Sequence, residues 1–164
     1  MSNFFSNLML ILFVYFCCAP KSYAEKSIVG WLEAAALKNK PDYLVIAKID
    51  TGADNSSLNA VNQEIYERNG DLWVKFSLTT KSGREITFQN RIIKTALIKM
   101  KDGNLQRRNV IEINVCIGTI SKKIKVNLVD RSHFKYQMLI GRSFLKGDFL
   151  VDSEEKFTVE PDCR

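Results

Sequence analysis

Hydrophobic and polar residues alternate with a period of two along most of the chain after residue 27. The alternation is strict over residues 72–78, 111–117 and 124–128, where every second residue is Leu, Val, Ile or Phe. Such a pattern is typical of strands that bury one face. Turn-forming residues separate these segments at 69–71, 81–83, 102–104 and 118–119. Short strands joined by close turns predict an antiparallel barrel or sandwich.

Other segments complete a mainly all-β prediction. The apolar run Tyr43–Ile49 is expected to form a strand that leads directly into a polar stretch. Residues 141–147 predict one or two helical turns, closed by Gly147. Trp31–Lys38 has helical propensity and is expected to form a short helical turn or a loop. A chain of 164 residues is long enough for one domain and too short for two with proper cores.

The first 24 residues differ from the rest and are predicted to be a signal peptide. Residues 8–19 form one apolar run, which is shorter than the roughly 20 residues of a membrane span. A small-x-small sequence ends at Ala24, so cleavage is expected there, leaving residues 25–164 as the mature domain. No Lys or Arg precedes the run, which keeps an uncleaved inner-membrane anchor as the alternative. We therefore expect an exported protein, located in the periplasm unless the segment anchors it.

Composition and charge exclude several classes of function. The formal net charge is +6, but the basic residues are scattered and no nucleic-acid-binding module is apparent. The single histidine, His133, and the absence of H-E-x-x-H argue against a catalytic zinc site, and no phosphate-binding loop occurs. We expect no metal and no cofactor. Cys116 and Cys163 either form a disulfide or remain two free thiols, and both possibilities stay open at this point.

The segment Ile49-Asp50-Thr51-Gly52-Ala53-Asp54 carries the most specific chemistry in the chain. A carboxylate follows an apolar strand, and the glycine allows backbone amides to approach it. The Asp-Thr-Gly tripeptide alone favours an ordinary β-turn. A second segment far downstream, residues 138–145, changes this interpretation. Its pattern predicts an apolar strand that ends at Gly141 and Arg142 and is followed by a short helix.

In these two segments the chain resembles the retropepsin-like aspartic proteases. It is most similar to a bacterial branch that is labelled an ATP-dependent zinc protease. The matching blocks are Gly30-Trp31-x-Glu33, Ala47–Ala53, Ser57–Ala60, Trp73-Val74-x-Phe76, Arg108-x-Val110-Ile111, Met138–Arg142 and Val151-Asp152. The branch usually has Arg-Thr where this chain has Asp54-Asn55, which looks more like the retroviral form. The resemblance implies a single-lobe acid-protease β-barrel. The zinc and ATP in the label do not fit the residues present, because the chain has neither a zinc-binding motif nor a phosphate-binding loop.

The resemblance also implies a site and a mechanism. Asp50 would be the catalytic carboxylate, and because the chain has one Asp-Thr-Gly, Asp50 of a second copy would complete the dyad. Active-site support is expected from six further residues: Thr51, Gly52, Ala53, Asp54, Gly141 and Arg142. Among these, Thr51 would brace the dyad across the interface, and Asp54 would form an ion pair with Arg142. The turn at 81–83 is the expected flap over a peptide substrate.

Three other functions are compatible with the same residues. The chain could be a catalytically silent relative that keeps the fold as a binding or scaffold module. It could be a peptidase that trims acidic tails such as oligoglutamate, which its basic net charge would suit. It could also be a partner of a cell-envelope protein without enzymatic activity. Peptide hydrolysis by a homodimer is the primary prediction, since Asp50, Thr51 and Gly52 are all intact.

Overall fold

The computed structural model describes residues 25–99 and 102–163. The predicted signal peptide or anchor at residues 1–24 lies outside these residues. Within the described residues, no helix is both long and apolar enough to cross a membrane. The elements in chain order are β1 (Ser27–Gly30), β2 (Leu32–Leu37), η1 (Pro41–Tyr43), β3 (Leu44–Ile49), β4 (Ser56–Asn59), β5 (Val61–Arg68), β6 (Asp71–Thr79), β7 (Glu85–Arg91), β8 (Lys94–Lys99), β9 (Leu105–Ile117), β10 (Ile120–Val129), β11 (Met138–Ile140), α2 (Arg142–Leu145) and β12 (Phe149–Asp152).

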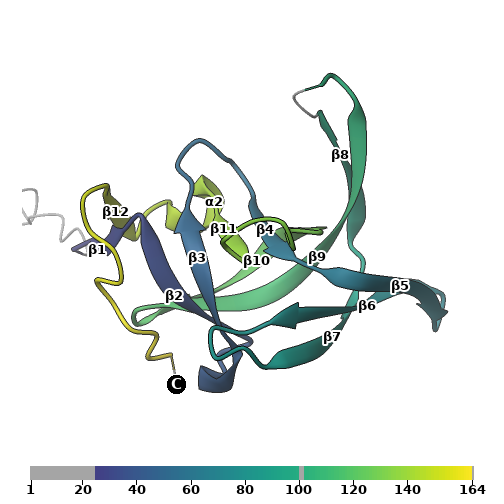
Figure 1. Cartoon of the computed structure of the whole chain (residues 1–164), viewed down its shortest axis with the longest axis horizontal. Coiled ribbons are helices and arrows are strands. Elements are labelled where there is room, and N and C mark those ends of the chain that lie inside the picture. The colour runs from purple at the N-terminus through teal and green to yellow at the C-terminus, as the bar shows by residue number, and fades with distance from the viewer. Residues whose placement is uncertain (1–24, 100–101, 164) are drawn as a thin grey trace, which may run out of the picture.

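A closed sheet forms the body of the molecule (Figure 1). Its strands lie in the order β10-β4-β11-β3-β2-β9-β8, and β10 also pairs with β9, which closes the sheet into a barrel. The short strand β11 lies between β3 and β4, parallel to β3 and antiparallel to β4. The loop from β3 to β4 therefore passes over the end of β11. This topology brings the two segments singled out in the sequence next to each other.

The predicted alternation is confirmed in the barrel core. The odd-numbered positions of β9 from 111 to 117 and the even-numbered positions of β10 from 124 to 128 point inward and are buried. Phe144 and Phe149 stack with ring centroids 5.4 Å apart and cover the end of the core near α2. The all-β class with one short C-terminal helix is also confirmed, and Gly147 follows that helix with a φ of +94°.

Two appendages extend from the barrel. Strands β5, β6 and β7 form a three-stranded antiparallel sheet, and its β5–β6 turn lies far from the barrel (Figure 1). Strand β8 pairs with the first part of β9 to form a hairpin that rises on the same side as the β3–β4 loop (Figure 1). A separate parallel pair joins the two ends of the described chain, because Ser27–Gly30 pairs with Phe149–Asp152.

The helical turn or loop expected at Trp31–Lys38 is wrong. The segment forms strand β2, which pairs with β3 along five residues and with the end of β9. All six residues of β2 are buried, so its alanines serve as small side chains that allow close packing on both faces. Tertiary pairing here overrides the helical propensity of alanine, which is a weak local preference.

The C-terminal segment after β12 is held by side chains as well as by backbone hydrogen bonds. Cys116 and Cys163 form a disulfide, which resolves the open question about the two thiols. The buried carboxylate of Glu33 accepts hydrogen bonds from the Gly30 amide at 2.6 Å and from the amide and hydroxyl of Thr158 at 3.1 Å and 2.7 Å. A buried carboxylate with several donors of this kind is a stable anchor for an otherwise irregular segment.

Candidate active site

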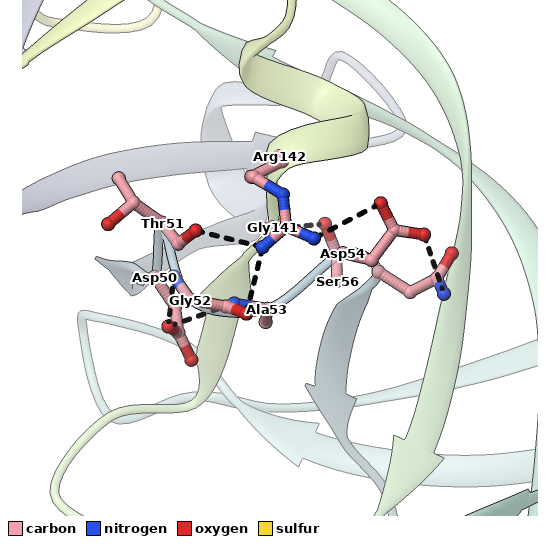
Figure 2. A network of polar contacts seen from close by, with 9 residues as sticks. Asp50, Thr51, Gly52, Ala53, Asp54, Ser56, Gly141 and Arg142 are labelled. Carbon is pink, nitrogen blue, oxygen red and sulfur yellow. Dashed lines mark hydrogen bonds and ion pairs between the residues drawn. The ribbon is translucent and has the colours of Figure 1, made fainter.

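Asp50 lies directly after the last residue of β3. Its amide donates a hydrogen bond to the Ile140 carbonyl at 2.9 Å, which ties the loop to the end of β11. One carboxylate oxygen accepts hydrogen bonds from the amides of Gly52, at 3.1 Å, and Ala53, at 3.2 Å. The side chain is half-buried, whereas Thr51 and Gly52 beside it are exposed. The loop therefore holds an oriented carboxylate at the molecular surface (Figure 2).

Gly141 allows the two segments to meet. A Cβ atom at this position would lie 2.7 Å from the Asn55 carbonyl carbon and 2.8 Å from the Asp54 carbonyl oxygen. The Gly141 amide donates to the hydroxyl of Ser56 at 3.1 Å. The contact is so close that only glycine fits without a shift of the backbone.

The first turn of α2 completes the connection. The amide of Arg142 donates to the Ala53 carbonyl at 2.9 Å, and the amide of Ser143 donates to the Asp54 carbonyl at 3.0 Å. These are amides at the start of a helix, which have no partner inside the helix. The loop carbonyls thus accept the hydrogen bonds that the first helical amides would otherwise lack, and these bonds hold the loop against the helix.

Arg142 binds the loop differently from the expected bidentate ion pair. One guanidinium nitrogen donates to the carbonyls of Thr51 at 3.0 Å and Gly52 at 2.8 Å. The other lies 3.7 Å from an Asp54 oxygen, and both of these side chains are exposed (Figure 2). The predicted ion pair is therefore present but long, and an exposed pair of this kind contributes little to stability. The main contacts of Arg142 are therefore with the backbone of the Asp-Thr-Gly loop.

An open depression lies beside this loop. It has a volume of about 540 Å³ and is lined by residues of the loop, α2 and β12, including Thr51, Asp54, Arg142, Phe149 and Val151. The expected cross-subunit role of Thr51 stays a prediction, since it concerns a second copy of the chain. The depression borders the exposed side of the Asp-Thr-Gly loop, where such a copy would approach.

The flap expected at residues 81–83 is wrong. The Lys81 amide donates to the carbonyl of Leu44, which begins β3, whereas Asp50 follows the end of the same strand. The β6–β7 turn therefore lies at the opposite end of the barrel from Asp50 (Figure 1). The β8–β9 hairpin lies on the same side of the barrel as the β3–β4 loop (Figure 1), and Ala96 and Ile98 of β8 line a cavity of about 70 Å³ together with Asn55.

Two basic residues, Lys48 and Arg131, were not identified as site residues from the sequence. Lys48 precedes Asp50 by two residues in β3, and its partner across β11 is Leu139, whose partner in β4 is Ser57. Arg131 is buried, and its guanidinium lies 3.5 Å from the hydroxyl of this same Ser57. Burial lowers the pKa of Arg131, the charge of Arg108 lowers it further, and the negative charge of Asp50 raises it. These residues could have been found only from strand register, because they are far apart in the sequence.

Across residues 25–99 and 102–163, no three His, Cys, Asp or Glu side chains gather as a metal site would require. The Asp50 carboxylate, which backbone amides orient, is a group that suits acid–base chemistry.

Comparison with known proteins agrees with this geometry. The curated relatives include proteins named "Probable alpha-L-glutamate ligase" from Shewanella halifaxensis, 31% identical over 136 residues, and from Desulfotalea psychrophila, 28% identical over 130 residues. The matches cover 81% and 77% of this chain but only 30% and 28% of those proteins, so the chain spans less than a third of their length. A solved structure of the Legionella pneumophila protein Lpg0085, of unknown function, superimposes with a TM-score of 0.70 at 31% identity. That match covers 83% of this chain and all of the Legionella chain.

The family model described as the retropepsin-like aspartic endopeptidase RimB matches residues 28–162, nearly all of the described chain. This range contains both the Asp-Thr-Gly loop and the Gly141-Arg142 segment that the fold brings together. The chain therefore belongs to the RimB-like family of retropepsin-like aspartic endopeptidases.

Proposed function

We propose that this protein is an aspartic endopeptidase that cleaves peptide bonds with Asp50 and with Asp50 of the partner subunit. The observation that carries the proposal is the oriented, half-exposed carboxylate of Asp50 at a loop held by Gly141 and Arg142. A single carboxylate cannot act as both acid and base on one peptide bond. Two such groups about 3 Å apart share one proton, so that one activates water while the other protonates the carbonyl oxygen.

A homodimer would supply the second carboxylate. The exposed side of the Asp-Thr-Gly loop adjoins the parallel pair of strands β1 and β12 through the depression lined by Thr51 and Val151. Ile28 and Leu150 are paired on these strands and are 58% and 54% exposed. Two neighbouring exposed aliphatic side chains on the strand pair that borders the depression favour burial against a second copy of the chain.

We further propose that the protein works in an oxidising compartment, as an exported enzyme. The disulfide between Cys116 and Cys163 supports this location, because such bonds persist in the periplasm and are rare in the cytosol. The apolar run at residues 8–19 supports the same location. Anchoring of the chain by this run is the alternative to cleavage.

An acidic peptide is the substrate class that the relatives favour. Proteins named probable alpha-L-glutamate ligases contain a segment similar to this chain. The name of these relatives indicates that they join glutamate to another molecule. A hydrolase that is similar to one segment of such a ligase would act on glutamate-rich chains. The basic net charge would attract such a substrate.

The test is cleavage of a peptide library by purified protein with Asp50 replaced by Asn, at acidic and neutral pH. Asp50→Asn is expected to lower kcat by at least about a thousandfold with the fold retained, since the dyad then lacks an ionisable group. Asp71→Asn is the control, because Asp71 is an exposed carboxylate of the distant β6 strand. Equal activity of Asp50→Asn and the unaltered protein would refute the proposal. Absence of cleavage by both would favour the silent binding module.

A further inference from the structure

Lys122 interrupts the core-facing side of strand β10. Alternate residues of this strand from Ile124 to Leu128 point into the barrel and are buried, and Lys122 continues the same face. Its side chain is 25% exposed, whereas that of the next residue, Lys123, is 66% exposed and pairs with Glu112 on the outer face. A cation at a position where the strand pattern predicts an apolar residue needs partners that compensate its partial burial.

The partners of Lys122 lie at the end of α2. Its ammonium group donates hydrogen bonds to the Phe144 carbonyl at 2.5 Å and to the Lys146 carbonyl at 3.3 Å, and it forms an ion pair with Asp148. The ammonium nitrogen also lies 5.3 Å and 5.8 Å from the centres of the Phe144 and Phe149 rings. The last carbonyls of a helix have no partner inside the helix, and a lysine can donate to them. Lys122 therefore holds the C-terminal end of α2 against the barrel.

The short helix α2 depends on contacts at both of its ends. It has four residues, and a helix of this length is not stable by itself. At the end opposite to Lys122, two of its amides donate to the carbonyls of Ala53 and Asp54. The same loop orients the Asp50 carboxylate through the amides of Gly52 and Ala53. A displacement of α2 would therefore displace the loop that orients this carboxylate.

We infer that Lys122 is a positioning residue for catalysis, which holds the end of α2 and thereby fixes the loop that orients Asp50. The inference rests on the proposed function, because the orientation of Asp50 affects activity only if Asp50 is the catalytic group. Lys122 acts through the backbone hydrogen bonds of α2 and not on the substrate. Small displacements of a catalytic group lower the rate of a reaction strongly, so loss of the ammonium group should be visible in kcat.

The test compares Lys122→Met with Lys123→Met in the full-length protein. Methionine keeps a long unbranched side chain but removes the charge and the donors. Lys122→Met is expected to lower kcat at least about tenfold for a peptide that the unaltered protein cleaves, with KM changed less than about twofold. Lys123→Met removes an exposed ion pair of the same strand and should change neither value by more than about twofold. Lys122→Arg should restore part of kcat, because it keeps the charge and the donors.

Amide hydrogen exchange tests the inference independently of cleavage. The amides of Arg142 and Ser143 are expected to exchange at least about tenfold faster in Lys122→Met than in Lys123→Met, while the amides of the β9–β10 ladder report any general loss of stability. Equal exchange of the two amides in both variants would overturn the inference, and so would faster exchange with unchanged kcat. If the unaltered protein cleaves no peptide, the proposed function fails, and the exchange rates still decide whether Lys122 holds the loop.

Discussion

At the scale of single residues, the site depends on close contacts between backbone groups rather than on charge pairs. The carboxylate of Asp50 is oriented by two amides, and Arg142 acts mainly through the carbonyls of Thr51 and Gly52. The exposed pair between Asp54 and Arg142 adds little, because water screens both groups. The geometry of the Asp-Thr-Gly loop is therefore sensitive to changes that displace its backbone.

Replacement of Gly141 by Ala should disrupt this arrangement. The added methyl group would meet the backbone of Asp54 and Asn55 at 2.7–2.8 Å, so the loop must move away from α2. We expect the free energy of unfolding to fall by roughly 1–3 kcal/mol and activity to be lost, as measured by urea denaturation and peptide cleavage. Ser143→Ala, at an exposed neighbouring position, should change stability by less than about 0.5 kcal/mol. A Gly141→Ala protein with unchanged stability and activity would show that the close approach is unimportant.

Some of these residues were predictable from the sequence, and others were not. Asp50, Gly141 and Arg142 lie in two short motifs, so the topology that joins them could be expected once both were identified. Lys48 lies inside the first motif, but the residues beside it on the sheet follow only from the strand register. Arg131 lies in a loop with no pattern, and only the fold brings its guanidinium to Ser57.

At the scale of elements, strand β2 and the C-terminal segment support each other. Trp31 and Leu32 form backbone hydrogen bonds with Glu155 and Phe157, and Glu33 anchors Thr158. The sequence predicted a short helical turn or a loop at β2, because alanine favours helices where no tertiary contact opposes them. The strand forms because β3 and β9 supply pairing on its two edges. Period-two strands such as β9 and β10 were predicted correctly because one buried face leaves a clear pattern.

Removal of the disulfide between Cys116 and Cys163 should weaken the attachment of the C-terminal segment to the barrel and lower the stability of the protein. The bond joins residues 47 apart, so its loss increases the conformational freedom of the unfolded chain. We expect the Cys116→Ala, Cys163→Ala protein to lose about 2–4 kcal/mol of unfolding free energy, as measured by urea denaturation. Reductant should shift the unaltered protein toward the variant and leave the variant unchanged. Equal stability of the two proteins without reductant would contradict this account.

At the scale of the whole molecule, the barrel presents the Asp-Thr-Gly loop at its surface. The β3–β4 loop carries Asp50 beside an exposed depression, and the neighbouring β1–β12 pair exposes Ile28 and Leu150. The barrel class could be predicted from the sequence, since alternation and turns recur along the chain. The end of the barrel at which the 81–83 turn lies could not be predicted, because only the strand order distinguishes the two ends.

The most direct measurement is the activity of a fixed amount of unaltered protein as increasing amounts of Asp50→Asn protein are added, after time for subunits to exchange. If each site needs Asp50 from two chains, mixed dimers are inactive, and an equal amount of variant should reduce activity to about half. Mass spectrometry of the mixture should detect the mixed dimers. Unchanged activity in the presence of mixed dimers would show that one chain suffices, and would contradict the shared dyad.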